Sequence, residues 1–154
     1  MAIFQSSVKL NCPAAQAFDF LAKPANIALI SPPDMGLCFV SAPEEIVLGA
    51  KLEFKIQSFG QVQELIHEIT HLERPLLFVE RQLKGPLKSW VHEHRFEILG
   101  DNQVEIFDVI EFLPPGGLLG FLVTETRILD SLDEGFELRY RKLKQLLEDQ
   151  SVGI

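Results

Sequence analysis

The last long segment of the chain has the apolar spacing of one amphipathic helix. Between Gly117 and Asp149, apolar side chains recur at intervals of three, four or seven residues, and charged residues occupy the other face. The apolar set is Leu118, Leu122, Leu129, Leu132, Phe136, Tyr140, Leu143 and Leu147. A helix of about 32 residues is roughly 48 Å long at a rise of 1.5 Å per residue. Such a stripe needs a broad partner surface, and the preceding sequence supplies candidate strands.

The middle of the chain alternates apolar and polar residues with a period of two, which predicts β-strands. In Lys51–Phe59, for example, Leu52, Phe54 and Ile56 alternate with polar residues. Turn residues separate successive runs, notably glycine and proline. The predicted strands are 37–42, 51–59, 62–72, 76–84, 89–99 and 103–113. Short turns between consecutive strands predict an antiparallel meander.

The first part of the chain predicts one strand and two short helices. Ala2–Leu10 has the pattern of a strand, and Ala14–Ala22 carries apolar residues on one helical face. Pro24 ends that helix, Ala25–Ile30 predicts a second one, and Ser31–Asp34 interrupts the pattern with two prolines. The order of elements is therefore strand, two helices, six strands and a long helix, which is an α+β arrangement.

Composition limits the classes of partner. The 154 residues suffice for one domain, expected over residues 1–150 with a tail at 151–154. The net charge of −8 argues against binding to nucleic acid or to an anionic membrane surface. No apolar stretch reaches the length of a transmembrane helix, and no signal peptide is visible. Cys12 and Cys38 are far apart, which favours reduced thiols in a cytoplasmic protein.

Alternation assigns the side chains of the last two strands to faces. Trp90, His92, His94 and Phe96 share a face with the apolar character of a core. In the next strand, Asp108 is the one carboxylate on a face that also carries Val104, Ile106, Ile110 and Phe112. A short turn at Gly100–Asn102 then places His94 opposite Asp108 and Phe96 opposite Ile106. The same reasoning at the Gly85-Pro86 turn places Arg81 opposite His92.

Arg81, His92, His94 and Asp108 are therefore expected to project together into an otherwise apolar concavity. Burying ionisable groups is costly unless they are paired. Three interpretations are open: the polar end of a ligand pocket, a paired cluster that orients strands, or an acid/base pair formed by His94 and Asp108.

The remaining histidines do not predict a metal site. His67 and His71 share a face, and the number of residues in the turn at Arg74-Pro75 decides whether that face points inward. On a strand these two residues are about 13 Å apart, and His92 and His94 are about 7 Å apart. No Cys/His spacing typical of zinc sites is present. We therefore expect no metal and no cofactor.

The order of elements and three local motifs resemble the helix-grip fold of the START-like (SRPBCC) superfamily. The motifs are Pro13–Phe20, Gly85–Phe96 and Asp108–Pro114. The superfamily includes lipid-transfer START domains, polyketide cyclase/dehydrases, pollen-allergen-like proteins and coenzyme Q-binding proteins, and the motifs are similar to uncharacterised bacterial members. The resemblance implies a curved antiparallel sheet of about seven strands wrapped around the C-terminal helix, with two short helices after the first strand.

The resemblance also implies a cavity between sheet and helix for a hydrophobic small molecule such as a lipid, quinone or polyketide. Its entrance would be formed by loops, for which residues 31–35 and 114–117 are candidates. The predicted ligand-binding residues are Arg81, Trp90, His92, His94, Phe96, Asp108, Phe112, Leu129, Leu132 and Phe136.

Two alternative functions stay open at this point. One is a cyclase, dehydratase or isomerase that uses His94 and Asp108. No motif matches the catalytic residues of characterised cyclases closely enough to transfer a role. The other is a protein-interaction module without catalysis. The chain is expected to be a monomer or a homodimer.

Overall fold

The structure is a computed structural model, and it describes residues 1–148. Its strands are β1 (Ala2–Leu10), β2 (Cys38–Ser41), β3 (Lys51–Ser58), β4 (Gln61–Glu73), β5 (Leu77–Lys84), β6 (Ser89–Gly100) and β7 (Gln103–Leu113). Its helices are α1 (Ala14–Leu21), α2 (Pro24–Ile30), α3 (Leu119–Leu122) and α4 (Glu125–Glu148), with a 3-10 turn η1 (Pro33–Met35). The predicted tail at 151–154 lies outside the described residues.

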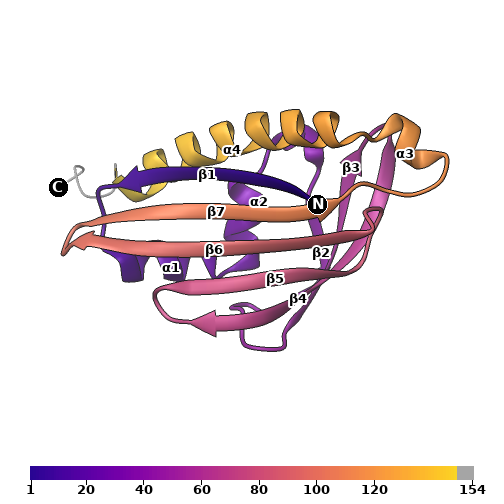
Figure 1. The fold of residues 1–154 in the computed structure, drawn as a ribbon. Coiled ribbons are helices and arrows are strands. Elements are labelled where there is room, and N and C mark those ends of the chain that lie inside the picture. The colour runs from indigo at the N-terminus through magenta and orange to yellow at the C-terminus, as the bar shows by residue number, and fades with distance from the viewer. Residues whose placement is uncertain (149–154) are drawn as a thin grey trace.

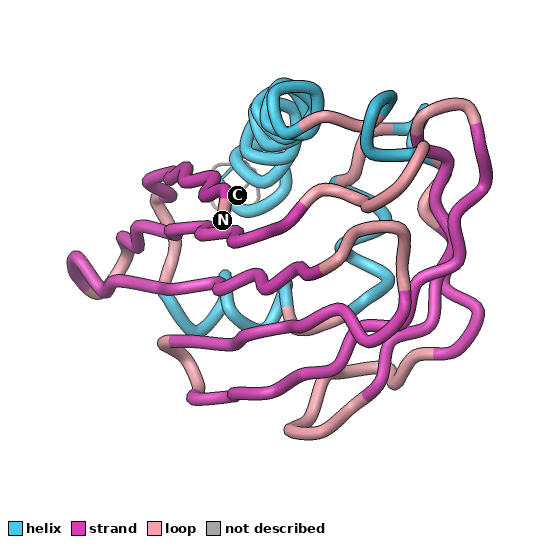
Figure 2. The backbone as a smooth tube through the Cα atoms, turned by 45° about the vertical axis from the view of Figure 1, so that its right-hand side comes forward, coloured by secondary structure: helices cyan, strands magenta, loops and turns pink. Residues whose placement is uncertain are grey.

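All seven strands form one antiparallel sheet. Its order is β1-β7-β6-β5-β4-β3-β2, so the first strand of the chain pairs with the last. The sheet curves beneath α4, which runs alongside β1 (Figures 1 and 2). Helix α1 packs on β6 and β7, and α2 contacts α4 and β2. The predicted α+β architecture, with a long C-terminal helix over a curved sheet and short helices after β1, is confirmed.

Phenylalanine rings fill one end of the core between α1 and the sheet. The ring of Phe18 on α1 is fully buried and lies 5.7 Å from the ring of Phe78 and 5.0 Å from that of Phe96, measured between centroids. Arg74 lies over the outer side of Phe18, at 5.1 Å from its centroid. The aromatic rings fill the space between α1 and the sheet. Phe78 also lines the cavity that is described below.

The C-terminal segment forms two helices instead of the single helix that its spacing predicts. Val123 takes a non-helical backbone conformation, with φ −107° and ψ 80°. The hydroxyl of Thr124 then accepts a hydrogen bond from the backbone N–H of Arg127 at 3.3 Å, which caps the start of α4. The break changes the direction of the apolar stripe, so Leu118 and Leu122 are exposed. The 24 residues of α4 keep the remainder of the predicted stripe against the sheet.

The register of β6 and β7 is the predicted one. His94 lies opposite Asp108, and Phe96 lies opposite Ile106. A slip of one residue would have moved both apolar faces into solvent, so the pattern fixes this pairing strongly.

The predicted pairing of Arg81 with His92 is wrong by one residue. Glu80 lies opposite His92, so Glu80 is on the inner face and Arg81 is exposed on the outer face. The pairing of β5 with β6 ends at Arg81 and Val91, so residues 82–90 form a wide, unpaired end of this hairpin. Gln82 supports this connection by donating a hydrogen bond to the carbonyl of Leu87 at 2.7 Å. A wide connection does not set the register as a tight turn does.

The structure also decides the orientation of the two histidines of β4. Ile69 pairs with Glu80 and His71 pairs with Val79, which leaves Thr70 as an extra residue in a β-bulge. His67 consequently points inward and is buried, whereas His71 is exposed.

The two cysteines lie in different surroundings, which predicts different reactivities. Both thiols are free, with Cys12 buried and Cys38 exposed. Burial, followed by the charge of Glu148, raises the pKa of Cys12 to about 11. We expect a thiol reagent at neutral pH to modify Cys38 in the folded protein and Cys12 only after unfolding, as read by peptide mass spectrometry. Equal rates at the two positions would contradict this burial of Cys12.

Among residues 1–148, no helix is long and apolar enough to cross a membrane.

Candidate functional site

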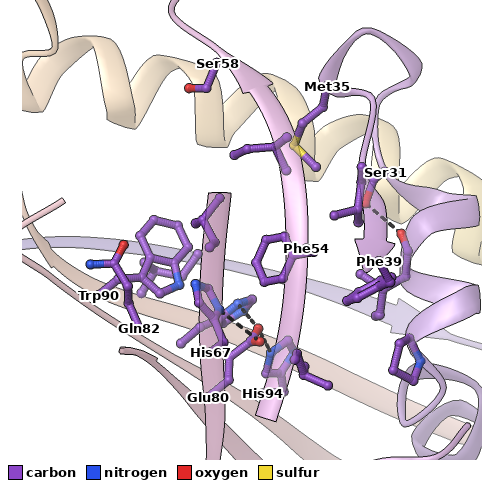
Figure 3. Close-up of a pocket in the computed structure, with 18 of the residues that line it drawn as sticks. Ser31, Met35, Phe39, Phe54, Ser58, His67, Glu80, Gln82, Trp90 and His94 are labelled. Atoms are coloured by element: carbon purple, nitrogen blue, oxygen red, sulfur yellow. Dashed lines mark hydrogen bonds and ion pairs between the residues drawn. The ribbon is translucent and has the colours of Figure 1, made fainter. Parts of the chain in front are cut away.

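A cavity of about 290 Å³ lies between the inner face of the sheet and the helices α2 and α4. Its wall is mostly apolar, with Phe54, Ile110 and Phe136 among the lining residues. Figure 3 shows Phe54 together with Phe39 and Trp90. Polar side chains meet it from β4, β5 and β6, because alternate residues of these strands face inward. A mostly apolar wall with a few placed polar groups is typical of small-molecule sites, and this volume is near the lower end of their range.

A second hollow of about 420 Å³ adjoins the cavity. The two share Met35 of η1, Ile56, Ser58 and Phe59 at the end of β3, and Ser131 of α4. Of the two predicted entrance loops, residues 31–35 contribute to the cavity wall through Ser31 and Met35. Residues 114–117 do not line it. Instead, the turn between β3 and β4 lines the cavity through Phe59.

The polar end of the cavity is built on the carboxylate of Glu80. Its Oε1 lies 3.1 Å from Nε2 of His94 and 3.3 Å from Nδ1 of His92. Its Oε2 lies 3.3 Å from Nδ1 of His67. Figure 3 shows the carboxylate between His67 and His94. Three histidines from β4 and β6 thus converge on one side chain of β5.

Asp108 of β7 supports this group from behind. Its Oδ1 accepts a hydrogen bond from Nε2 of His92 at 2.8 Å, and its Oδ2 accepts one from the hydroxyl of Tyr140 at 2.6 Å. Nδ1 of His94 lies 3.4 Å from the same Oδ1, without a hydrogen bond. Asp108, His92 and His94 are each at most 4 % exposed.

Burial and hydrogen bonding set the charges of the cluster. Burial alone would raise the pKa of Glu80, but hydrogen bonds with three histidines lower it well below its usual range. Burial opposes the charged form of His92, yet hydrogen bonds to Asp108 and Glu80 outweigh burial and raise its pKa. Burial and the charge of His92 lower the pKa of His94 to about 4. At neutral pH, Glu80 is therefore ionised and His94 is neutral, and the two carboxylates favour the protonated form of His92.

The carboxyl of Asp108 is held in its ionised form. Burial favours the neutral acid, but the hydrogen bond with His92, followed by the charge of Arg139, lowers the pKa of Asp108. Burial, and then the charge of Asp108, raises the pKa of Tyr140. The hydroxyl therefore stays protonated and donates a hydrogen bond to Asp108.

Several polar atoms of the cavity wall lack a hydrogen-bond partner among residues 1–148. They include Nε and Nη2 of Arg139, Nε1 of Trp90 and Nε2 of His67, all shielded from solvent. The guanidinium of Arg139 stacks on the ring of Phe136, at 5.1 Å from its centroid. Groups of this kind carry a large penalty when buried without a partner.

The predicted ligand-binding residues divide into three groups. Those that line the cavity are Trp90, His92, His94 and Phe136. Those that are buried or partly buried without lining it are Phe96, Asp108, Phe112, Leu129 and Leu132. Arg81 is exposed on the outer face. Whether the lining residues bind a ligand stays a prediction.

Two residues of the site were missed by sequence reasoning. Glu80 follows from the alternation Phe78, Glu80, Gln82 once β5 is in the correct register. Arg139 follows Phe136 by three residues on α4, so the two share a helix face. The position of Arg139 beside the apolar stripe of α4 could have indicated a positive charge near the cavity.

The fold was compared with those of known proteins. No family model matches the chain, and no curated protein matches it. Among solved structures, a START superfamily protein from Mycobacterium smegmatis is similar with a TM-score of 0.69 and 11% identity, covering 96% of this chain and 98% of that one. The ZhuI aromatase/cyclase of a Streptomyces species is similar with a TM-score of 0.68 and 18% identity, covering 96% and 92%. A major latex-like protein of Panax ginseng gives a TM-score of 0.68 and 14% identity, covering 95% and 97%.

These likenesses extend over nearly the whole chain at low identity, so they show a shared fold. The chain has the helix-grip fold, as these structures do.

Proposed function

We propose that this protein binds a small hydrophobic molecule in the cavity between sheet and α4, with a hydrogen-bond acceptor of that molecule at Arg139. The observation that carries the proposal is the guanidinium of Arg139 in a mostly apolar wall, whose Nε and Nη2 lack a hydrogen-bond partner among residues 1–148. An acceptor such as a carbonyl or carboxylate would satisfy its Nε and Nη2.

The apolar wall supports a compact ligand. Rings of Phe54, Trp90 and Phe136 offer flat surfaces for an aromatic or polycyclic body. The volume of about 290 Å³ favours such a compact body over a long-chain lipid. One similar structure is named an aromatase/cyclase, and this name is compatible with a ring-shaped ligand in the same fold.

Binding can be followed through Trp90, because the chain has one tryptophan and it lines the cavity. We expect 2-naphthoate to change the fluorescence of Trp90 and to bind more tightly than naphthalene, which lacks the acceptor. A hydrogen bond to a charged group contributes about 1.5–3 kcal/mol, so Arg139→Gln should weaken 2-naphthoate about tenfold to a hundredfold and leave naphthalene nearly unchanged.

The matched control is Arg141→Gln, on the same helix but exposed and paired with Glu137. It should leave both affinities unchanged. Equal losses in the two variants would show a general effect of charge and would contradict an anchor at Arg139. No response of Trp90 to either compound would contradict the cavity as the site.

A further inference from the structure

Three side chains at the polar end of the cavity have the composition and spacing of a metal site. We propose that Glu80, His92 and His94 bind one divalent transition-metal ion, for which Zn²⁺ is the best match. This proposal goes beyond ligand binding and requires no organic ligand.

The distances between the donor atoms support the proposal. One donor atom from each residue lies within 4.8 Å of the others. Oε1 of Glu80 is 3.1 Å from Nε2 of His94 and 3.3 Å from Nδ1 of His92. Donor atoms around a tetrahedral Zn²⁺ with bonds of about 2.0–2.1 Å lie about 3.3–3.4 Å apart. The carboxylate oxygen therefore already stands at the spacing of a coordinated ligand.

The donor types select the class of metal. Two imidazoles and one carboxylate suit Zn²⁺ and related transition metals, whereas Mg²⁺ and Ca²⁺ prefer oxygen ligands alone. No metal was expected from the sequence because of the distances between histidines along the strands, and Arg81 was expected on this face. The register that brings Glu80 opposite His92 removes that cation and adds a carboxylate ligand.

Regular strands hold the ligands in place. His92 and His94 are alternate residues of β6 and point to the same face, with ring centroids 3.6 Å apart. Glu80 projects from the neighbouring strand at the paired position. Ligands on paired strands of a sheet are more exactly placed than ligands on loops.

Two of the three proposed ligands, His92 and Glu80, are oriented by another residue. Nε2 of His92 donates to Asp108 at 2.8 Å, the arrangement in which a carboxylate holds a metal-bound histidine. Asp108 is held in turn by Tyr140. Oε2 of Glu80, the oxygen that does not face His92 and His94, is 3.3 Å from Nδ1 of His67.

The position of the proton on the ring of His94 gives a separate argument for a metal. When its Nε2 donates to Glu80, its buried Nδ1 has no hydrogen-bond partner within residues 1–148, although Oδ1 of Asp108 is only 3.4 Å away. If Nε2 instead coordinates a metal, the proton resides on Nδ1 and faces that carboxylate. A bound metal would therefore put a proton on the ring nitrogen that lies 3.4 Å from the carboxylate of Asp108, in place of a lone pair that faces a negative charge.

The site also keeps a position open. Glu80, His92 and His94 all line the cavity, so a water molecule or a ligand atom can complete the coordination. Three protein ligands plus one exchangeable position are typical of zinc sites that act on small molecules.

The test is a titration of tag-free, chelator-treated protein with Co²⁺ and Zn²⁺ in a Cys38→Ser background, which removes the exposed thiol. We expect one Co²⁺ per chain, with visible absorption bands of a four- or five-coordinate site that Zn²⁺ displaces. Glu80→Gln and His94→Gln should each weaken binding at least tenfold. The control is His71→Gln, an exposed histidine on β4, which should bind as the parent does.

Nitrogen-15 NMR of the histidine rings covers the case in which a variant does not fold. Zn²⁺ should shift Nδ1 of His92 and Nε2 of His94 in the unsubstituted protein and leave the ring of His71 unchanged. The proposal is overturned if the parent binds no more tightly than the two ligand variants, if His71→Gln removes binding, or if the rings of His92 and His94 do not respond. The cluster would then be a paired network of charges that binds no metal.

Discussion

Replacing Asp108 with asparagine is expected to lower the free energy of unfolding by about 3–5 kcal/mol. The carboxylate is 1 % exposed and accepts hydrogen bonds from His92 and Tyr140. Asparagine has nearly the same shape but removes the charge, which leaves the buried ring of His92 without its anionic hydrogen-bond partner. The loss is measured by urea unfolding followed through the fluorescence of Trp90.

The control for this variant is Glu111→Gln, on the same strand but exposed. This substitution likewise replaces a carboxylate with a neutral amide, and it should alter the free energy of unfolding by less than about 0.5 kcal/mol. A loss below about 1 kcal/mol for Asp108→Asn would mean that the cluster is not the tightly paired group that its hydrogen bonds indicate.

Replacing Phe18 with alanine is expected to cost about 3–5 kcal/mol as well, for a different reason. The ring is fully buried and fills the space between α1 and the strands, in contact with Phe78 and Phe96. Its removal leaves a cavity that these two rings cannot close without leaving their own packing.

The matched control is Phe121→Ala, since Phe121 on α3 is 81% exposed. It should change the unfolding midpoint very little. Comparable losses in both variants would contradict the assignment of the aromatic core to the end of the sheet that faces α1.

The parts of the fold that could be predicted are those where two patterns constrain each other. The pairing of β6 with β7 is an example, because apolar residues alternate on both strands and one tight turn joins them. The position of His94 opposite Asp108 followed from that constraint. The hydrogen bond of Asp108 to His92, instead of His94, depends on ring orientation, which a strand register does not determine.

The errors arose where one pattern was ambiguous. The run Leu76–Val79 is apolar on both faces, so β5 had no alternation strong enough to correct the register that placed Arg81 inward. The spacing from Leu122 to Leu129 continues a helical pattern across a break, so the change of direction at Val123 was not visible. Likewise, Arg139 contributes to the site only through the packing of α4 over the sheet.

The most direct measurement of the central claim is an isotope-filtered NMR experiment on the protein saturated with 2-naphthoate. We expect contacts from the ring protons of the ligand to Trp90, Phe54 and Ile110, together with a shift of the Nε–H resonance of Arg139. Contacts confined to the exposed apolar residues of α3, Phe121 and Leu122, would contradict it, because binding would then take place on the outer surface and not in the cavity.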